Sequence, residues 1–293
     1  MRISTEYKFD SINSAISQAD QTYVKLGNEL STGKSINQVS DDPYTASLAI
    51  SQTALQSTLT QYNTNITYAN SFLGLTDSSL SSIESLTNSA ISLTQQAANS
   101  TVDQSARAAM ASQVAQLEQR LVSLGNTQTA SGSYIFAGQV TQTQPYTVSG
   151  STLTYNGDSN AITAETGPNS SVQINTDASS VITGLYSQLT QLQTDLASGN
   201  VTALSGTDLS NLQNTASQVL QLRGNVGAAV QTVTADQTMN EQRITDLTKD
   251  VSSETDADYA STIVKYTTAQ NAYQGALTVA SQTFKLSLLN FLQ

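Results

Sequence analysis

The sequence predicts a mainly α-helical protein: a long antiparallel helical bundle, or coiled-coil rod, formed by the N- and C-terminal halves, with a small β-rich insert. Apolar residues recur at alternating three- and four-residue steps through both halves of the 293-residue chain, which is the period of packed helices. In the middle, short β-branched and aromatic segments alternate with turn sequences instead. The simplest topology folds the chain back on itself, with the insert at the far tip.

The first helix is expected over about residues 5–31. Gly33 follows the last apolar position and is typical of the residue that ends a helix, so residues 33–42 are predicted to form a loop. Asp42 followed by Pro43 matches an N-cap with proline at the first helical position. A second, very long helix is therefore predicted to begin at Pro43.

The second helix carries its apolar rhythm from Leu55 to Ala90. The sequence Thr101–Gln104 matches a capping box and predicts the start of a third helix, which Gly125 is expected to end. Beyond the third helix the helical period disappears.

A small β-rich domain is predicted over residues 131–177. The segments between its turn sequences are too short for helices and are rich in β-branched and aromatic residues. They are the runs 134–136, 146–148, 152–155, 161–163 and 172–174.

Helices are expected to resume near Ala178, with a first stripe that ends at 199–200. The next apolar seam, from Leu209 to Val251, is the longest in the chain. The sequence Thr255–Asp258 matches another capping box and predicts the start of the final helix.

Both end helices carry an apolar seam, whereas chain ends usually fray and hold little apolar material. Such helices need a partner, and the alternatives are each other, further copies of the chain, or both. We expect the seams to pack between subunits. The predicted subunit-packing residues are Ile12, Ile16, Tyr23, Leu26, Leu30, Ile263, Tyr266, Tyr273, Leu277, Phe284, Leu288 and Phe291.

Composition excludes several classes of function. The net charge of −11 and the lack of a Lys/Arg cluster argue against binding to nucleic acid or to an anionic membrane surface. No run of about 18 apolar residues predicts a membrane span, and the first 30 residues lack the apolar core of a cleavable signal. The chain has no His and no Cys, which removes the commonest nucleophile–base pairs and transition-metal ligands.

No catalytic residue, cofactor or metal ion is therefore predicted. Asp41 and Asp42 are adjacent carboxylates, and we interpret them as a helix cap rather than as a catalytic or calcium site. The sequence 156–158 is interpreted as a turn. Arg223 occupies an apolar seam position and leaves two alternatives open: a packed stem with its charged head at the surface, or an ion pair that sets the register of the helices.

Two terminal motifs resemble a known family. The runs 30–37 (LSTGKSIN) and 40–43 (SDDP) resemble the N-terminal signature of bacterial flagellins and their relatives, and 287–292 (SLLNFL) is similar to the matching C-terminus. Proline at position 43, where flagellins commonly have alanine, favours one branch of the family, the hook-associated branch that adjoins the filament.

Further motifs extend this resemblance along nearly the whole chain, in order. The start of the chain, 1–5 (MRIST), and the runs 134–138 (YIFAG) and 155–158 (YNGD) resemble the same hook-associated branch, and 223–228 (RGNVGA) matches a segment shared by both branches. Each motif is weak alone, and together they are specific.

The resemblance implies a structural adaptor of the bacterial flagellum, exported through the flagellar type III apparatus with a chaperone and assembled as a ring between hook and filament. Its expected partners are a neighbouring hook-associated protein on the hook side and flagellin on the filament side. It also implies three layers: terminal helices (1–42 and 257–293) for polymerisation, a helical rod (43–130 and 178–256), and the β-rich domain (131–177) outermost.

Two other functions stay open from the sequence. The first is a filament-forming flagellin, which differs in forming long filaments alone. The second, more remote, is a secreted sugar-binding or enzymatic protein. That role needs convergent acidic and polar groups in the insert, whose acidic residues are only Asp158, Glu165 and Asp177.

Overall fold

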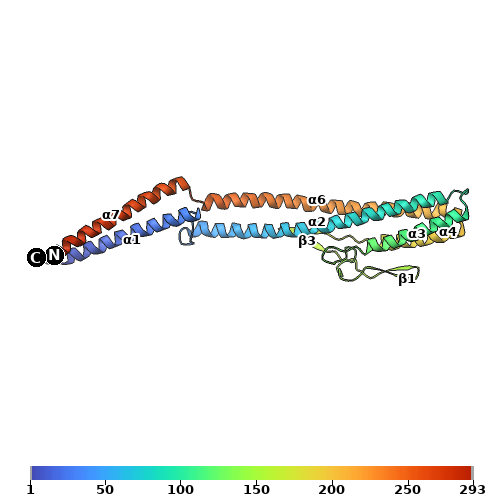
Figure 1. Ribbon diagram of the computed structural model, residues 1–293, viewed down its shortest axis with the longest axis horizontal. Helices are drawn as coiled ribbons and strands as arrows, with labels where there is room; N and C mark the ends of the chain where they lie inside the picture. The colour runs from blue at the N-terminus through green and yellow to red at the C-terminus, as the bar shows by residue number, and fades with distance from the viewer. Residues whose placement is uncertain (1, 292–293) are drawn as a thin grey trace. The chain divides into compact units, whose positions relative to one another are not determined.

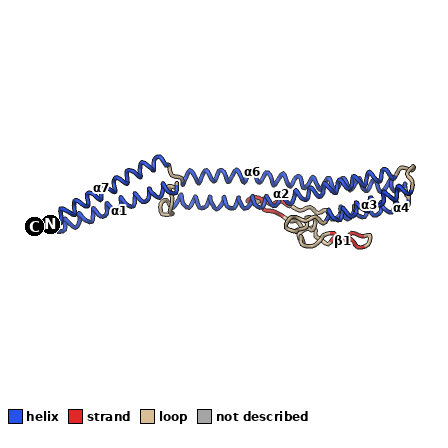
Figure 2. The backbone as a smooth tube through the Cα atoms, viewed as in Figure 1, coloured by secondary structure: helices blue, strands red, loops and turns tan. Residues whose placement is uncertain are grey.

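The computed structural model describes the backbone of residues 2–291 and the side chains of residues 6–283. These residues fall into two compact units, coloured along the chain in Figure 1. Unit 1 comprises the described residues up to Thr58 and those from Arg243 onward, and unit 2 runs from Leu59 to Gln242. Helices dominate both units, and the strands are confined to short segments (Figure 2). The predicted fold class is confirmed.

Unit 1 is built around two helices from opposite ends of the chain, α1 (Arg2–Thr32) and α7 (Tyr259–Phe291), which pack against each other. The pairing is antiparallel, because the side chain of Tyr266 lies beside Gly27 and that of Tyr259 lies beside Gly33. Gly33 has a φ of +72°, so it ends α1 in the left-handed conformation that glycine adopts without strain.

The predicted start of α2 (Pro43–Ala97) is confirmed. The Oδ1 atom of Asp42 accepts the backbone N–H groups of Tyr44 at 3.1 Å and Thr45 at 3.2 Å, and Pro43 needs no partner because it has no N–H. The hydrogen bonds from Thr45, first that of its side chain and then that of its backbone, lower the pKa of Asp42. This aspartate therefore serves as a helix cap, as the sequence indicated.

Unit 2 contains the remainder of α2 together with α3 (Gln104–Gly125), α4 (Ser179–Ser198) and the first part of α6 (Leu209–Thr255). A short helix, α5 (Val201–Ala203), and a π-helical turn, η1 (Leu204–Asp208), connect α4 to α6. Figure 1 shows α3 and α4 side by side. One continuous apolar core joins these helices, and its fully buried side chains include Leu80, Ile83, Val114, Leu121, Leu185, Leu189, Leu192, Val219 and Val233.

The expected capping box at the start of α3 is wrong by two residues. Asp103, rather than Thr101, is the N-cap, and its carboxylate accepts the N–H of Ala106 at 2.7 Å. A carboxylate so placed also interacts favourably with the positive end of the helix dipole. Gly125 ends α3 as predicted.

Buried hydroxyl groups explain how a chain with so few charges fills its helix interfaces. Thr76, Thr87 and Thr94 on α2 are fully buried, and each donates its hydroxyl to the carbonyl oxygen four residues earlier at 2.8–2.9 Å. Because the hydroxyl is satisfied within its own helix, burying it leaves no unpaired polar group. Small polar residues can therefore occupy seam positions beside Leu and Ile.

The middle segment forms two separate antiparallel hairpins. Strands β1 (Tyr146–Ser149) and β2 (Thr152–Tyr155) pair with Tyr146 opposite Tyr155, and β3 (Thr163–Gly167) pairs with β4 (Ser170–Gln173). The four pairing segments thus lie where the sequence indicated, although β3 and β4 are shifted by up to four residues. The run 134–138 is a loop rather than a strand, with one isolated bridge from Tyr134 to Gln128.

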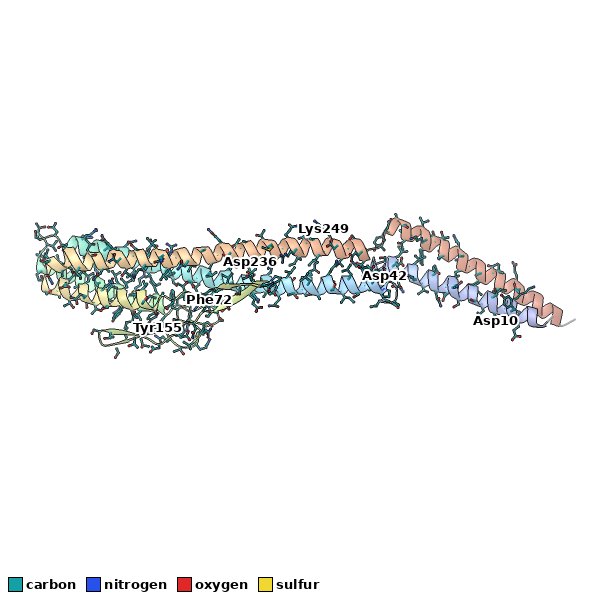
Figure 3. The ribbon with its side chains drawn as sticks, turned by 180° about the vertical axis from the view of Figure 1, so that it is seen from behind. Asp10, Asp42, Phe72, Tyr155, Asp236 and Lys249 are labelled. Carbon is teal, nitrogen blue, oxygen red and sulfur yellow. The ribbon has the colours of Figure 1, made fainter. Side chains whose placement is uncertain are left out.

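The expected position of the insert at the far tip is wrong. The β3–β4 hairpin is bound to α2 and α6 by Asn65 and Asn240, which donate to the carbonyl oxygens of Glu165 and Thr166 at 3.0 and 2.8 Å. Asp236, labelled with Tyr155 and Phe72 in Figure 3, also accepts the hydroxyl of Thr166. At 1.5 Å per residue, Asn65 lies about 48 Å along α2 from its end at Ala97.

Residues 98–103 and 199–208 form the end of unit 2 where the insert was expected. There the Gln104 side chain on α3 donates to the carbonyl of Ala197 on α4. The insert lies elsewhere because two-stranded hairpins cannot bury their own apolar side chains. Tyr146, Leu153 and Val172 instead join the helical core.

Of the two alternatives for Arg223, the ion pair is confirmed. Its Nε lies 2.9 Å from Oδ1 of Asp77, and an outer nitrogen lies 2.6 Å from Oε2 of Glu84. Asp77 and Glu84 are two turns apart on α2, so the guanidinium of α6 bridges them. The three side chains are 23–44% exposed, which leaves the charges partly hydrated and limits the desolvation cost.

Candidate assembly surface

The seam residues predicted on α1 face α7 in unit 1. Ile12, Ile16, Tyr23, Leu26 and Leu30 are all partly buried, at the four- and three-residue steps that the sequence showed. Packing of α1 against α7 accounts for this burial. These residues therefore pack within one chain, and further packing between subunits stays a prediction.

Three tyrosines form the centre of the α1–α7 interface. The ring of Tyr23 stacks on Tyr266 with centroids 5.0 Å apart and on Tyr273 with centroids 6.0 Å apart. The hydroxyl of Tyr266 donates to that of Tyr23 at 2.9 Å, which raises the pKa of Tyr266. Aromatic pairs of this kind contribute about 0.5–1.5 kcal/mol beyond the area that they bury.

Two further residues of the predicted α7 seam, Ile263 and Leu277, are exposed. Ile263 is 50% exposed and Leu277 is 43% exposed, while Ala269 and Ala280 are buried against α1. The side chains of Phe284, Leu288 and Phe291 lie outside the described residues. Unit 1 therefore presents large apolar side chains of α7 to solvent.

The flanks of the α1–α7 pair are apolar as well. A groove of about 650 Å³ runs between the two helices, with Leu26 on one side and Val264 and Ala272 on the other. Charged side chains of Lys25, Glu29 and Lys265 also line it. Tyr7, Val24 and Val279 add further exposed apolar surface, at 76%, 50% and 56% exposure. The groove and these exposed side chains make the flanks of the pair a candidate surface for protein–protein contact.

A compact joint follows the pair, where the loop after α1 meets the link between α6 and α7. The N–H of Ser35 donates to the carbonyl of Thr255 at 2.7 Å, and the N–H of Ala257 donates to that of Gly33 at 2.9 Å. Lys34 forms an ion pair with Asp256, which also accepts the hydroxyl of Ser252. These two interactions, with Lys34 as the larger cause, lower the pKa of Asp256.

Sequence reasoning missed this joint. Thr255–Asp258 had been interpreted as one capping box, but the cap of α7 is Asp258, whose Oδ1 accepts the N–H of Ala260 at 3.0 Å. Thr255 and Asp256 are therefore available to Lys34. The signal that could have revealed the joint was a pair of short polar links, with Lys34 in the link after α1 and Asp256 in the link before α7.

Asp41, the first aspartate of the SDDP motif, also has a structural role. One carboxylate oxygen of Asp41 accepts the backbone N–H groups of Gln38 at 3.0 Å and Asn37 at 3.1 Å, and the other lies 3.4 Å from Nζ of Lys25. The hydrogen bond from Gln38 is the largest cause of the lowered pKa of Asp41. Asp41 thus closes the loop and Asp42 caps the next helix.

Replacing Asp256 by Asn should loosen the joint without unfolding either unit. The variant keeps the shape of the side chain but removes the charge that holds Lys34, so amide hydrogen exchange of residues 33–38 and 252–258 should increase. The exposed substitution Asp250→Asn, on the preceding helix α6, is the matched control and should leave exchange unchanged. Equal exchange in all three proteins would contradict a role for this ion pair.

The same joint should loosen in acid. The folded pKa of Asp256 lies below its unfolded value, so its contribution is fully present above about pH 4 and is lost as the pH falls through the folded pKa. Amide exchange of the joint should therefore differ between wild type and Asp256→Asn above about pH 4 and should become the same in both proteins at low pH.

Within the described part of the chain, no three or more acidic, His or Cys residues gather in a way that could hold a metal ion. None of the described helices is both long and apolar enough to cross a bilayer. The candidate functional site is therefore a surface. It is formed by the α1–α7 pair, and the polar joint holds one end of that pair.

Comparison with known proteins gives this surface a context. Residues 3–141 match the family described as the bacterial flagellin N-terminal helical region. The chain is 27% identical to flagellar hook-associated protein 3 of Escherichia coli strain K12, across 98% of both chains. It is 25% identical to the protein of the same name from Salmonella typhimurium strain LT2, across 94% of this chain and 95% of the other.

A solved structure shares the fold. The flagellar hook-associated protein from Vibrio parahaemolyticus superimposes with a TM-score of 0.69 at 18% identity, covering 74% of this chain and 100% of its own. The chain is thus similar in sequence to flagellar hook-associated proteins, and its fold is that of a solved protein of the same description. The N-terminal part of the chain resembles the bacterial flagellins, and over nearly its whole length the chain resembles hook-associated protein 3.

Proposed function

We infer that this chain is an adaptor subunit that joins the hook of the bacterial flagellum to its filament. It is a component of the extracellular part of the flagellum. The observation that carries the proposal is the exposed apolar surface of the α1–α7 pair, in a chain that aligns almost end to end with hook-associated proteins. The proposed role is structural and not enzymatic.

The proposed mechanism of joining is packing of terminal helices between subunits. Within each subunit, the partly buried seam of α1 and the tyrosines of α7 hold the α1–α7 pair together. This leaves Ile263 and Leu277 free to contact a neighbouring subunit. Burying apolar surface contributes about 25 cal/mol per Å², so several side chains of this size per contact are sufficient to offset the cost of association.

The three-layer organisation is part of the proposal. Residues 1–42 and 257–293 pack as the inner polymerisation layer, residues 43–130 and 178–256 form the helical rod, and residues 131–177 lie outermost. The exposure of Val140 and Val148 in the insert, at 41% and 48%, supports a surface role for this domain.

We propose a homo-oligomeric ring with unlike neighbours on its two sides. A hook-associated protein contacts the hook side and flagellin contacts the filament side. A chaperone covers the apolar helices before type III export, since a helix pair with this much exposed apolar surface is prone to associate prematurely. Binding to nucleic acid and insertion into a membrane are not part of the proposal.

Cells that lack the protein provide the test. Electron microscopy should show complete hooks without attached filaments, with flagellin released into the medium, and the gene supplied in trans should restore filaments. Filaments of normal length on the mutant hooks would overturn the proposal. A purified protein that polymerised alone into long filaments would favour the filament-forming flagellin instead.

A further inference from the structure

Basic side chains are scarce in unit 2. Between residues 59 and 242 the chain has 11 Asp and Glu residues but only three arginines and no lysine. Arg107 is buried and donates to two backbone carbonyls, and Arg223 is held by two carboxylates of α2. Arg120, on α3, is therefore the one exposed basic side chain of this unit.

Arg120 has no acidic partner in its own chain. It lines a groove of about 680 Å³ between α2 and α3, whose other polar residues are uncharged serines and glutamines. Among the described residues its guanidinium forms no ion pair and no hydrogen bond. A guanidinium carries five N–H donors and no acceptor, so Arg120 is free to bind a carboxylate of another molecule.

An acidic pocket of about 470 Å³ lies elsewhere in unit 2, between α2, α6 and the segment that links β4 to α4. Leu73, Val172 and Val226 form its apolar base, and all three are buried. Asp177 is the only charged residue that lines it. A pocket of this size, with an apolar base and a few polar groups, is typical of a binding site.

The polar groups of this pocket are mainly acceptors. Oδ1 of Asp177 accepts the backbone N–H and the hydroxyl of Ser179 at 2.9 and 2.6 Å, which leaves Oδ2 without a donor in the described chain. Gln173 uses its Nε2 to donate to the carbonyl of Asn175 at 3.1 Å, so its side-chain oxygen remains to accept. A negative charge and an amide oxygen above an apolar base suit the donors and the aliphatic stem of an arginine.

Arg120 cannot reach the pocket of its own chain. Helices α3 and α4 run antiparallel, and the hydrogen bond of 3.0 Å between Thr190 and Glu118 places these two residues at the same level. Asp177 precedes Thr190 by about 13 residues, or about 20 Å of helix, and Arg120 covers only about 3 Å of that distance. The remainder is longer than an arginine side chain.

We propose that Arg120 of one subunit binds in the Asp177 pocket of the next subunit. The guanidinium pairs with the carboxylate of Asp177, and the stem of the side chain lies on Leu73 and Val226. The two surfaces differ, so the contact is heterologous, and a heterologous contact that is repeated by rotation closes into a ring. This contact rests on the homo-oligomeric ring proposed above and adds to it a second interface, outside the terminal helices.

The charges of unit 2 favour a second copy as the occupant. Each subunit supplies one arginine without a partner and one acidic pocket without a cation, so a ring of identical subunits leaves neither unpaired. The excess of acidic residues over the rest of the unit opposes other registers, because like charges that face each other across an interface are unfavourable.

Cross-linking of the full-length protein in cells tests the contact, and the absence of cysteine from the chain makes the test specific. Gln116→Cys marks the groove of Arg120 and Asn225→Cys marks the pocket, and both positions are exposed. With both cysteines present, a short bismaleimide added to cells that carry filaments should give dimers and longer ladders. Either cysteine alone should give none, because the contact joins unlike surfaces.

Arg120→Gln and Asp177→Asn should each lower the dimer yield about tenfold in this background. Asparagine still caps α4, so the melting temperatures of the purified variants should match wild type. The double variant should lose no more than either single variant, because the effects of two residues in contact are not additive. Glu165→Gln and Arg243→Gln, both exposed, are the matched controls and should keep the dimer.

An undiminished dimer in either single variant, or losses that multiply in the double variant, would overturn the proposal. So would a cross-linked product whose mass differs from that of a dimer or ladder, which would identify another protein as the occupant. Should Asp177→Asn melt lower than wild type, Gln173→Lys provides a second variant. It puts a cation into the pocket without changing the cap of α4, and should also reduce the dimer.

Failure of this contact is distinguishable from failure of the proposed function. Absence of the dimer in cells that carry normal filaments would overturn the contact and leave the joining of hook and filament intact. Filaments on the hooks of cells that lack the protein would instead overturn the proposed function, and with it the ring on which the contact rests.

Discussion

Leu277→Asp should abolish attachment to the hook while leaving the melting temperature of the isolated chain unchanged. Leu277 is 43% exposed on the flank of α7, so in the free subunit the new carboxylate reaches water and costs little. In the assembled state the same group must be buried without a partner or protonated, at a cost of several kcal/mol. Swimming motility and thermal melting, measured in parallel, separate the two states.

Asn271→Asp is the matched control for this substitution. It adds the same charge to the same helix at an exposed polar position with almost no change of shape, and motility should remain. Wild-type motility of Leu277→Asp would show that this flank is not an assembly surface. A large drop in the melting temperature of the isolated variant would place Leu277 in the fold of the subunit instead.

Leu189→Ala should have the opposite effects. Leu189 is fully buried on α4, within the core of unit 2, and truncating a buried leucine costs about 2–5 kcal/mol through lost burial and the cavity left behind. For a unit of this size the melting temperature should fall by roughly 10 °C. Attachment to the hook should persist below that temperature, because the terminal helix pair is unchanged.

The exposed neighbour Ser187 provides the control, since Ser187→Ala on the same helix should leave both properties intact. Differential scanning calorimetry and electron microscopy of hook ends measure the two outcomes. Loss of attachment by a Leu189→Ala protein that is still folded would mean that the core of unit 2 and the assembly surface are energetically coupled.

The starts and ends of the helices could be predicted from the sequence because the signals that set them are local. Asp42 and Pro43 start α2, Gly125 ends α3, and Gly199, with a φ of +73°, ends α4. Each signal depends on the conformational preference of one residue and its nearest backbone groups. The error at Thr101 has the same origin, because Asp103 competes for the cap and its charge makes it the stronger acceptor.

The orientation of α7 could not be predicted as reliably. The predicted seam steps through Ile263, Leu277 and Ala280, but in the structure Ile263 and Leu277 are exposed, while Ala280 and, outside the seam, Ala269 are buried. Which face of α7 packs against α1 depends on how the side chains of both helices fit together. Complementarity of size between two helices is a tertiary property that no single helix displays.

The position of the β hairpins could not be predicted for a related reason. Asn65, Asp236 and Asn240 look like ordinary polar residues on long helices, and their partners in β3 and β4 are about 70–100 positions away in the sequence. Periodicity records which face of an element is apolar. It does not record which distant polar groups satisfy one another, and those groups place the insert along the helices.

The three stacked tyrosines also give this protein an optical property. The chain has 12 tyrosines and no tryptophan, so tyrosine alone determines its absorption and emission near 280 nm. Rings held as close and as nearly parallel as Tyr23 and Tyr273, at 4° between planes, couple their transitions and acquire a circular dichroism that separated rings lack. The α1–α7 pair therefore contains its own chromophore. The packing of its two helices can be followed in unlabelled protein, in solution and in real time.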